Sequence, residues 1–268
     1  MHRGITAGRA LRAGLALVLA VLAQANMALA SRMDEGEALR SSQAAIGRIP
    51  GGYTFTAVDG SKFTLEQLRG RPIVLSLVYT SCYEVCSGLT LRLRETVKVA
   101  REALGSESFS VVTVGFDTPN DTPERMRLYA RERGALLPGW YFASTDATTI
   151  ERLAKDVGFT YLASPKGFDH ITQTTIIDPS GRVVLQVYGE DFAPPLVVEP
   201  LKKLVWGQNL DRTTWQGLVN NVRLLCTIYD PTSGRYRFDY SLIVNIIAGG
   251  LALGIAAAGS LAALRNVR

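Results

Sequence analysis

The sequence predicts one α/β domain, because short apolar strands alternate with amphipathic helices between residues 51 and 206. Two apolar runs, residues 73–79 and 109–116, are rich in branched side chains and too short for helices. We therefore expect two buried central strands. The segment between them, residues 89–104, has apolar residues at helical spacing. A strand, a helix and a second strand in this order indicate a parallel crossover.

Further elements extend this core on both sides. A β-type pattern at residues 53–58 is followed by Asp59-Gly60, which predicts a hairpin turn. Thr122 and Pro123 mark the start of a helix as its N-cap and first residue. The remaining elements are a strand at 140–143, a helix at 148–157, strands at 174–178 and 183–188 joined by a turn at 178–181, and a closing helix at 197–206. Together they predict a thioredoxin-like α/β sandwich.

Both ends of the chain carry export and membrane signals. Residues 1–30 have a basic start, an uncharged stretch and a final Ala28-Leu29-Ala30, which predicts a cleaved signal peptide. An uncleaved N-terminal anchor is the alternative. Residues 241–264 are uncharged and long enough for a transmembrane helix, and residues 265–268 form a basic cytoplasmic tail. We expect one C-terminal pass through the cytoplasmic (inner) membrane, with the body facing the periplasm.

The charge of the exported body argues against a nucleic-acid partner. The chain has 29 basic and 24 acidic residues, and the two terminal segments contain five arginines and no acidic residue. Residues 31–240 therefore carry 24 charges of each sign. A neutral body lacks the basic surface that nucleic-acid binding requires. On either side of the domain we expect a flexible spacer at 31–50 and a juxtamembrane connector at 207–240.

Two cysteines lie between the first buried strand and the next helix. Cys82 and Cys86 follow residues 73–79 at the carboxyl edge of the sheet, where open α/β folds bind ligands. A helix N-terminus favours the thiolate, and the i,i+4 spacing places both sulfurs on one face. The pair can bind a soft metal ion, cycle as a redox-active dithiol or close a structural disulfide. Cys226 has no ligating neighbour in the sequence, so we expect a free or membrane-proximal thiol and no metal ligand.

One histidine, His170, remains in the predicted exported body. A lone histidine is more often a surface or packing residue than a ligand. Here, however, its loop leads into the strand at 174–178 and can approach the Cys82 loop. One imidazole and two thiolates form a soft site suited to copper. Asp117 follows the second central strand and is either a hydrogen-bonding group beside this site or a turn residue next to Pro119.

Three segments of the sequence resemble the Sco/SenC family over roughly residues 50–205. They are residues 80–86 with both cysteines, the two Asp-Thr-Pro triplets at 117–119 and 121–123, and Asp169-His170 with residues 177–179. The family comprises membrane-tethered, thioredoxin-fold copper chaperones for the binuclear copper site of cytochrome c oxidase. The resemblance therefore implies this role, with Cys82, Cys86 and His170 as the copper ligands.

The sequence departs from the pattern of that family in two places. Tyr83 and Ser87 stand where the family usually has a proline after each cysteine. These two departures bear on the rigidity of the loop, the copper affinity and the redox potential. The predicted anchor is also C-terminal, whereas other family members are tethered at the N-terminus.

Two functions fit these features. A metallochaperone would bind Cu(I) or Cu(II) from a copper donor and pass it to the copper-site subunit of cytochrome c oxidase by ligand exchange. A thiol-disulfide oxidoreductase would use Cys82 and Cys86 to reduce cysteines of that copper site, and a periplasmic thiol reductant would regenerate the pair. His170 favours the chaperone, because a disulfide reductase needs no distant histidine. Whether the protein is an enzyme stays open, and a peroxidase of the same fold is a third possibility.

Overall fold

The computed structural model describes residues 33–82, 85–165, 167–207, 226–230, 232–241, 244–251 and 253–254. The predicted signal peptide, the cytoplasmic tail, Tyr83 and much of residues 207–240 and 241–264 lie outside the described residues.

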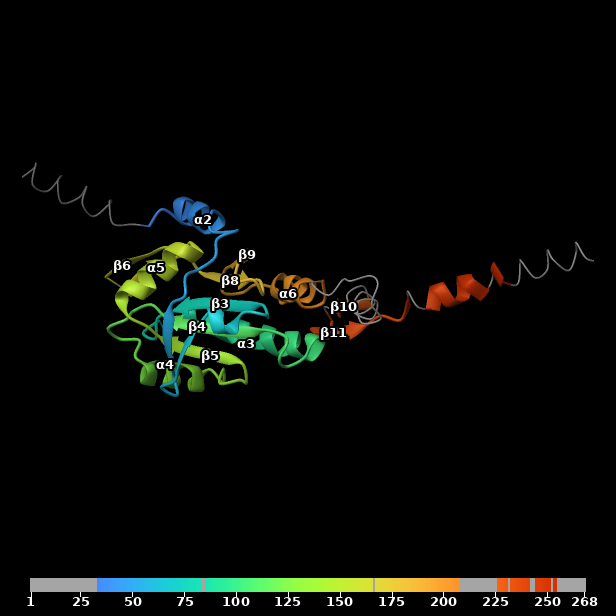
Figure 1. The fold of residues 1–268 in the computed structure, drawn as a ribbon, viewed down its shortest axis with the longest axis horizontal. Coiled ribbons are helices and arrows are strands. Elements are labelled where there is room, and N and C mark those ends of the chain that lie inside the picture. The colour runs from blue at the N-terminus through green and yellow to red at the C-terminus, as the bar shows by residue number, and fades with distance from the viewer. Residues whose placement is uncertain are drawn as a thin grey trace, which may run out of the picture.

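A seven-stranded mixed sheet forms the centre of the domain (Figure 1). Its strand order is β2-β1-β5-β4-β3-β8-β9. The central strands β3, β4 and β5 are parallel, and β1 and β8 pair antiparallel with the outer two of these three. The strands are β1 (Thr54–Ala57), β2 (Lys62–Thr64), β3 (Ile73–Val78), β4 (Ser110–Gly115), β5 (Trp140–Ser144), β8 (Gln173–Ile177) and β9 (Val183–Tyr188). This arrangement confirms the predicted thioredoxin-like α/β sandwich.

The two apolar runs of the sequence form the middle of this sheet. Every residue of β3 and β4 is buried, as expected for strands that are covered on both faces. Helix α3 (Val85–Leu104) connects the two strands, and their pairing is parallel. The predicted crossover is therefore confirmed, and it places the end of β3 beside the start of α3.

Five helices and one short 3₁₀ helix surround or connect the strands. In addition to α3 they are α2 (Glu35–Gln43), the 3₁₀ helix η1 (Glu66–Leu68), α4 (Pro123–Glu132), α5 (Ala147–Val157) and α6 (Pro195–Gly207). Thr122 caps α4 through a hydrogen bond from the backbone N–H of Arg125, as the sequence predicts. Helix α3 packs against α6 and extends toward the C-terminal hairpin (Figure 1).

The segment expected as a flexible spacer is instead a packed part of the domain. Asp34 caps α2 by accepting hydrogen bonds from the backbone N–H groups of Gly36 and Glu37. The buried hydroxyl of Ser42 donates to the side chain of Gln173 on β8 at 2.8 Å. The prediction of a spacer is therefore corrected for residues 35–50, which begin with a capped helix held on the sheet.

Two hairpins were not expected from the sequence. The first consists of β6 (Tyr161–Ser164) and β7 (Gly167–His170), so His170 ends a strand and does not lie in an irregular loop. The second consists of β10 (Thr227–Asp230) and β11 (Arg235–Phe238), within the predicted connector. The Nζ atom of Lys202 on α6 donates to the carbonyl oxygen of Thr227 at 2.7 Å, which fastens this second hairpin to the domain.

Beyond this hairpin, the described residues 244–251 and 253–254 are helical and exposed. Their large apolar side chains are 58% to 74% exposed. No helix within the described part of the chain has both the length and the apolar character needed to cross a membrane.

Candidate metal centre

The two cysteines lie on either side of the turn between β3 and α3. Cys86 is in the first turn of α3 and is 1% exposed, while Cys82 lies just before the helix and is 8% exposed. The backbone N–H of Cys86 donates to the Cys82 Sγ atom at 3.3 Å. Both cysteines are free thiols. The predicted strand-to-helix junction therefore brings the two sulfur atoms into one buried turn.

The β6-β7 hairpin brings His170 to this turn. The His170 Nε2 atom lies 3.7 Å from the Cys86 Sγ atom. The Nδ1 atom lies 3.2 Å from the carbonyl oxygen of Ile171, which can only accept, so Nδ1 carries a proton in this contact. In the neutral ring, Nε2 then keeps its lone pair on the side that faces the sulfur.

Aromatic rings hold the imidazole in place. The ring of Tyr79 lies edge-on to it at 5.9 Å between centroids, and the rings of Phe116 and Phe159 lie at 5.6 and 5.8 Å. Tyr79 directly follows β3, and Phe116 directly follows β4. The strand β3, which leads into the cysteine turn, therefore also helps to orient His170.

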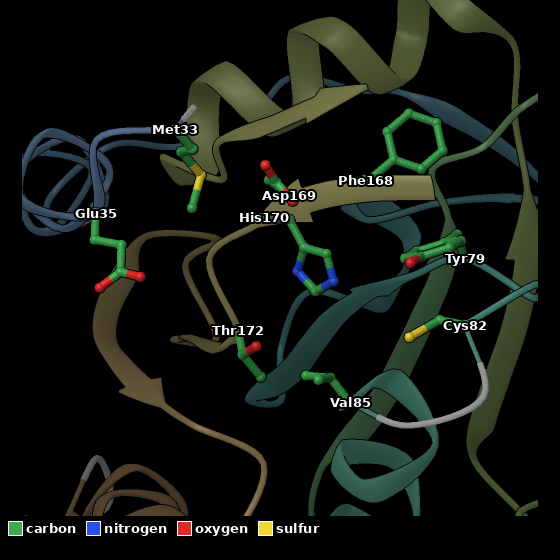
Figure 2. A pocket seen from close by; sticks show the side chains of 9 residues that line it. All are labelled: Met33, Glu35, Tyr79, Cys82, Val85, Phe168, Asp169, His170 and Thr172. Carbon is green, nitrogen blue, oxygen red and sulfur yellow. The ribbon is translucent and has the colours of Figure 1, made fainter. Parts of the chain in front are cut away.

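Cys82 and His170 open into a pocket of about 680 Å³ (Figure 2). Its lining residues come from four parts of the fold, namely Met33, Glu35, Tyr79, Cys82, Val85, Phe168, Asp169, His170 and Thr172. Figure 2 shows Tyr79 beside Cys82, with the carboxylate of Asp169 directed away from both cysteine and imidazole. The thiol and imidazole groups are thus accessible from one opening.

The pKa values of the two thiols are shifted in opposite directions. A hydrogen bond from the Cys86 thiol, with smaller contributions from the Cys86 N–H and from Tyr79, lowers the pKa of Cys82 to about 3 against the opposing effect of burial. The same bond with Cys82, together with burial, raises the pKa of Cys86 well above its ordinary value. Cys82 is therefore the thiolate of the pair and Cys86 the protonated thiol.

The carboxylate that contacts the cysteine loop belongs to Asp121. Asp121 is 1% exposed and accepts hydrogen bonds from the Thr80 N–H at 2.8 Å, the Thr80 hydroxyl at 2.7 Å and the Asp117 N–H at 2.9 Å. The Asp117 carboxylate accepts from the side-chain amide of Asn120, within its own turn. Of the two interpretations of Asp117, the structure therefore favours the turn residue. Sequence reasoning missed Asp121, although it lies in the second Asp-Thr-Pro triplet.

The donor atoms suit a soft metal ion. Two thiol sulfurs and one imidazole nitrogen are ligands that copper and zinc prefer. Sulfur and nitrogen ligands of one such ion, at bonds of about 2.0–2.3 Å, lie about 3.5–3.8 Å apart, and the separation between Cys86 and His170 is 3.7 Å. Within the described residues, no three His, Cys, Asp or Glu side chains already have the mutual spacing of a complete metal site.

Comparison with known families assigns the domain. The family model described as SCO1/SenC matches residues 41–205, which includes the cysteine turn, the Asp121 loop and His170. This match covers more than half of the chain.

The chain belongs to the SCO1/SenC family.

Individual relatives agree with this assignment. A protein of Bacillus subtilis (strain 168) named "SCO1 protein homolog" is 24% identical over 148 residues, which are 53% of this chain and 75% of the relative. The structure of Bradyrhizobium japonicum ScoI with copper bound is 21% identical, with a TM-score of 0.51, and covers 58% of this chain and 99% of that one. The structure of BsSco, described as a member of the Sco family of cytochrome c oxidase assembly proteins with a disulfide switch, is 18% identical. Its TM-score is 0.53, over 59% of this chain and 94% of that one.

The third cysteine of this SCO1/SenC protein lies at the start of the C-terminal hairpin. Cys226 is a free thiol and 2% exposed, and its carbonyl oxygen accepts a hydrogen bond from the N–H of Asp239. The expectation of a free thiol is confirmed. The family model ends at residue 205, so this hairpin lies outside the part that the family shares.

Proposed function

We propose that this SCO1/SenC protein is a membrane-anchored metallochaperone that delivers copper to the binuclear copper site of cytochrome c oxidase. Cys82, Cys86 and His170 are the proposed ligands, and copper is the cargo. The acceptor is the subunit of the oxidase that contains this site, and a periplasmic copper donor or thiol reductant prepares the protein for loading. This proposal rests on the soft donor set together with the family assignment.

The observation that carries the proposal is the contact between Cys86 and His170. The Sγ and Nε2 atoms lie 3.7 Å apart although 84 residues separate them in the chain. A hairpin and three aromatic rings hold this imidazole with its lone pair toward the sulfur. A protein that only exchanged disulfides would have no use for a nitrogen ligand at this position.

The different exposure of the three proposed copper ligands sets the order in which they would release the ion. Cys86 is buried at the base of the site, whereas Cys82 and His170 line the pocket that opens to solvent. A soft ligand of the acceptor would first replace Cys82 or His170, and Cys86 would release the ion last. The copper ion leaves with its oxidation state unchanged, so the transfer needs no electron donor.

The site is proposed to face the periplasm. The predicted signal peptide and the basic tail after residues 241–264 favour this orientation. The exposed apolar side chains of residues 244–251 and 253–254 fit a segment that lipid covers. The hydrogen bond from Lys202 of α6 to the Thr227 carbonyl oxygen of the C-terminal hairpin would then hold the domain close to its anchor.

The test is copper binding by the full-length protein in detergent. We expect one equivalent of Cu(II) and a thiolate-to-copper charge-transfer band in the wild type. His170→Ala should change this band strongly, and Cys82→Ser or Cys86→Ser should abolish it. Asp169→Asn is the matched control, because its side chain points away from the site (Figure 2). A wild-type spectrum in His170→Ala, with normal oxidase assembly in cells, would overturn the ligand set.

A second function, reduction of cysteines in the oxidase copper site, is favoured by the asymmetry of the thiols. The lowered pKa of Cys82 suits it to attack a disulfide of the partner, which forms a mixed disulfide and releases one partner thiolate. Cys86 would then lose its proton and attack the Cys82 sulfur, releasing the second partner thiolate and leaving a Cys82-Cys86 disulfide. If His170→Ala retained full function in cells, this reductase would become the better interpretation.

A further inference from the structure

The first turn of α3 is attached to α4 by a triangle of hydroxyl and carbonyl groups. The carbonyl oxygen of Cys86 lies 2.7 Å from the Tyr129 hydroxyl and 2.9 Å from the Thr90 hydroxyl, and these two hydroxyls lie 2.8 Å apart. The two hydroxyl groups supply one proton each, so only two of these three contacts can be hydrogen bonds at one time. In each possible arrangement at least one hydroxyl donates to the carbonyl oxygen. The backbone of Cys86 is therefore held from a neighbouring helix as well as from its own.

Arg133 holds the next residue from the same side. Its Nε–H donates to the Ser87 hydroxyl at 3.0 Å, and its guanidinium carbon lies 3.6 Å from the centre of the Tyr129 ring. One of its terminal N–H groups donates to the Tyr129 carbonyl oxygen at 3.0 Å. The backbone carbonyl of Arg133 in turn accepts a hydrogen bond from Arg94 of α3 at 2.7 Å. The two helices thus hold each other at the turn that contains Cys86.

This arrangement also places a largely buried positive charge beside Ser87, the residue that follows Cys86. The side chain of Arg133 is only 10% exposed, and a guanidinium group stays charged at all physiological pH values. Burying such a charge is unfavourable unless an opposite charge or hydrogen bonds offset the lost hydration. Its one ion pair within the described residues is with the exposed Glu132, at 3.5 Å. Through Ser87, this charge lies one residue along the chain from Cys86.

We propose that Tyr129 and Arg133 are positioning residues for the Cys82 and Cys86 pair. Tyr129 sets the geometry of the Cys86 turn through the carbonyl oxygen. Arg133 stabilises the reduced pair over the disulfide, because its charge favours a thiolate and has no such effect on a neutral disulfide. The inference deepens the proposed function and rests on the cysteine pair being its copper and redox centre.

The charge effect is measured by equilibrium with glutathione. In this reaction the Cys82-Cys86 disulfide and two glutathione thiols give the dithiol and one glutathione disulfide. For full-length Arg133→Gln in detergent we expect the equilibrium constant of reduction to fall about tenfold, which is about 30 mV for this two-electron couple. Arg133→Lys keeps the charge and should retain most of the wild-type value. The control is Arg131→Gln, an exposed arginine on the same helix, which should leave the constant unchanged.

The geometric effect is measured by the copper spectrum. Tyr129→Phe removes one hydroxyl and no charge, so we expect a glutathione equilibrium close to wild type but a shifted or broadened thiolate-to-Cu(II) band. Equal constants for Arg133→Gln and Arg131→Gln would overturn the role of Arg133. An Arg133→Lys constant as low as that of Arg133→Gln would overturn the charge mechanism, and an unchanged band in Tyr129→Phe would overturn the role of Tyr129. A wild type that binds no copper would refute the proposed function, while the glutathione measurement would still decide the role of Arg133.

Discussion

The Asp121 carboxylate accepts hydrogen bonds from both the N–H and the hydroxyl of Thr80, at 2.8 and 2.7 Å. Thr80 lies two residues before Cys82, so this buried carboxylate ties the cysteine loop to the loop that follows β4. The position of Asp121 depends on Gly115, since a Cβ atom there would lie 2.4 Å from the Asp121 Cβ atom. The cysteine loop is thus held by Asp121, and Asp121 fits in its position because Gly115 has no side chain.

Asp121→Asn should destabilise the fold and loosen the cysteine loop. The carboxylate accepts three hydrogen bonds on its two oxygens, and an amide has a single acceptor oxygen. Its NH₂ group would therefore face either the Asp117 N–H or the two donors of Thr80. We expect a loss of about 1–3 kcal/mol in the free energy of unfolding, measured by urea denaturation of the full-length protein. Asp117→Asn is the control, and equal losses in both variants would contradict this assignment.

The pH dependence of stability should also carry a contribution from Asp121. Burial raises the pKa of Asp121 above its usual 3.8, against the effect of its hydrogen bonds. The folded state then holds this proton at pH values where the unfolded state has lost it. The stabilising contribution is therefore complete below the unfolded pKa and is lost as the pH rises through the folded pKa. Over this acidic range, the stabilising contribution of Asp121 should decrease as the pH rises. The denaturation midpoint of the wild type should show this decrease, and that of Asp121→Asn should not.

The sequence predicts the central sheet because β3 and β4 are strongly apolar. It does not predict the β6-β7 hairpin, since β6 and β7 are half-exposed and contain no fully buried residue. His170 was therefore expected in a loop, although its approach to the cysteine loop was correctly expected. Helix α2 did carry a signal, because Asp34 followed by Glu37 is the pattern of an N-cap with an acidic third residue. Its polar composition led instead to the expectation of a spacer.

The two aspartates of the loop after β4 show what burial adds to a sequence pattern. Asp117 and Asp121 each begin an Asp-Thr-Pro triplet, and nothing in these triplets distinguishes them. The structure buries Asp121 and leaves Asp117 at the turn. The difference arises from the space left by Gly115 and from the hydrogen bonds between Asp121 and Thr80, which lies 41 residues earlier in the chain. Contacts of this kind cannot be deduced from local sequence alone.

The proposed topology predicts which parts of the protein a protease can reach. Protease added to intact spheroplasts should digest the body, residues 31–240, and leave a short fragment that contains residues 241–264. The basic tail and the export signal both favour this orientation. A cytoplasmic marker protein that stays intact is the control for lysis. Complete protection of the body in intact spheroplasts would refute the orientation.

Selective alkylation should distinguish the two thiols of the site. Because the pKa of Cys82 is lowered to about 3, its thiolate is fully formed across the neutral range. We expect iodoacetamide to modify Cys82 first, at a rate that is nearly constant between about pH 5 and pH 8. An ordinary cysteine, with a pKa of about 8.5, would react about tenfold faster for each pH unit over this range. Peptide mass spectrometry after brief labelling of the reduced protein gives the rate for each cysteine.

Cys86→Ala supplies the decisive comparison for this prediction. The hydrogen bond from the Cys86 thiol is the largest cause of the lowered pKa, whereas the backbone N–H of residue 86 remains in the variant. The pKa of Cys82 should therefore rise, and its alkylation should become faster as the pH increases. Cys226 is 2% exposed and serves as the slow reference within the same protein. If Cys82 reacted with the same pH profile in the wild type and in Cys86→Ala, its thiolate would not depend on Cys86, and the asymmetry that supports a reductase would lose its basis.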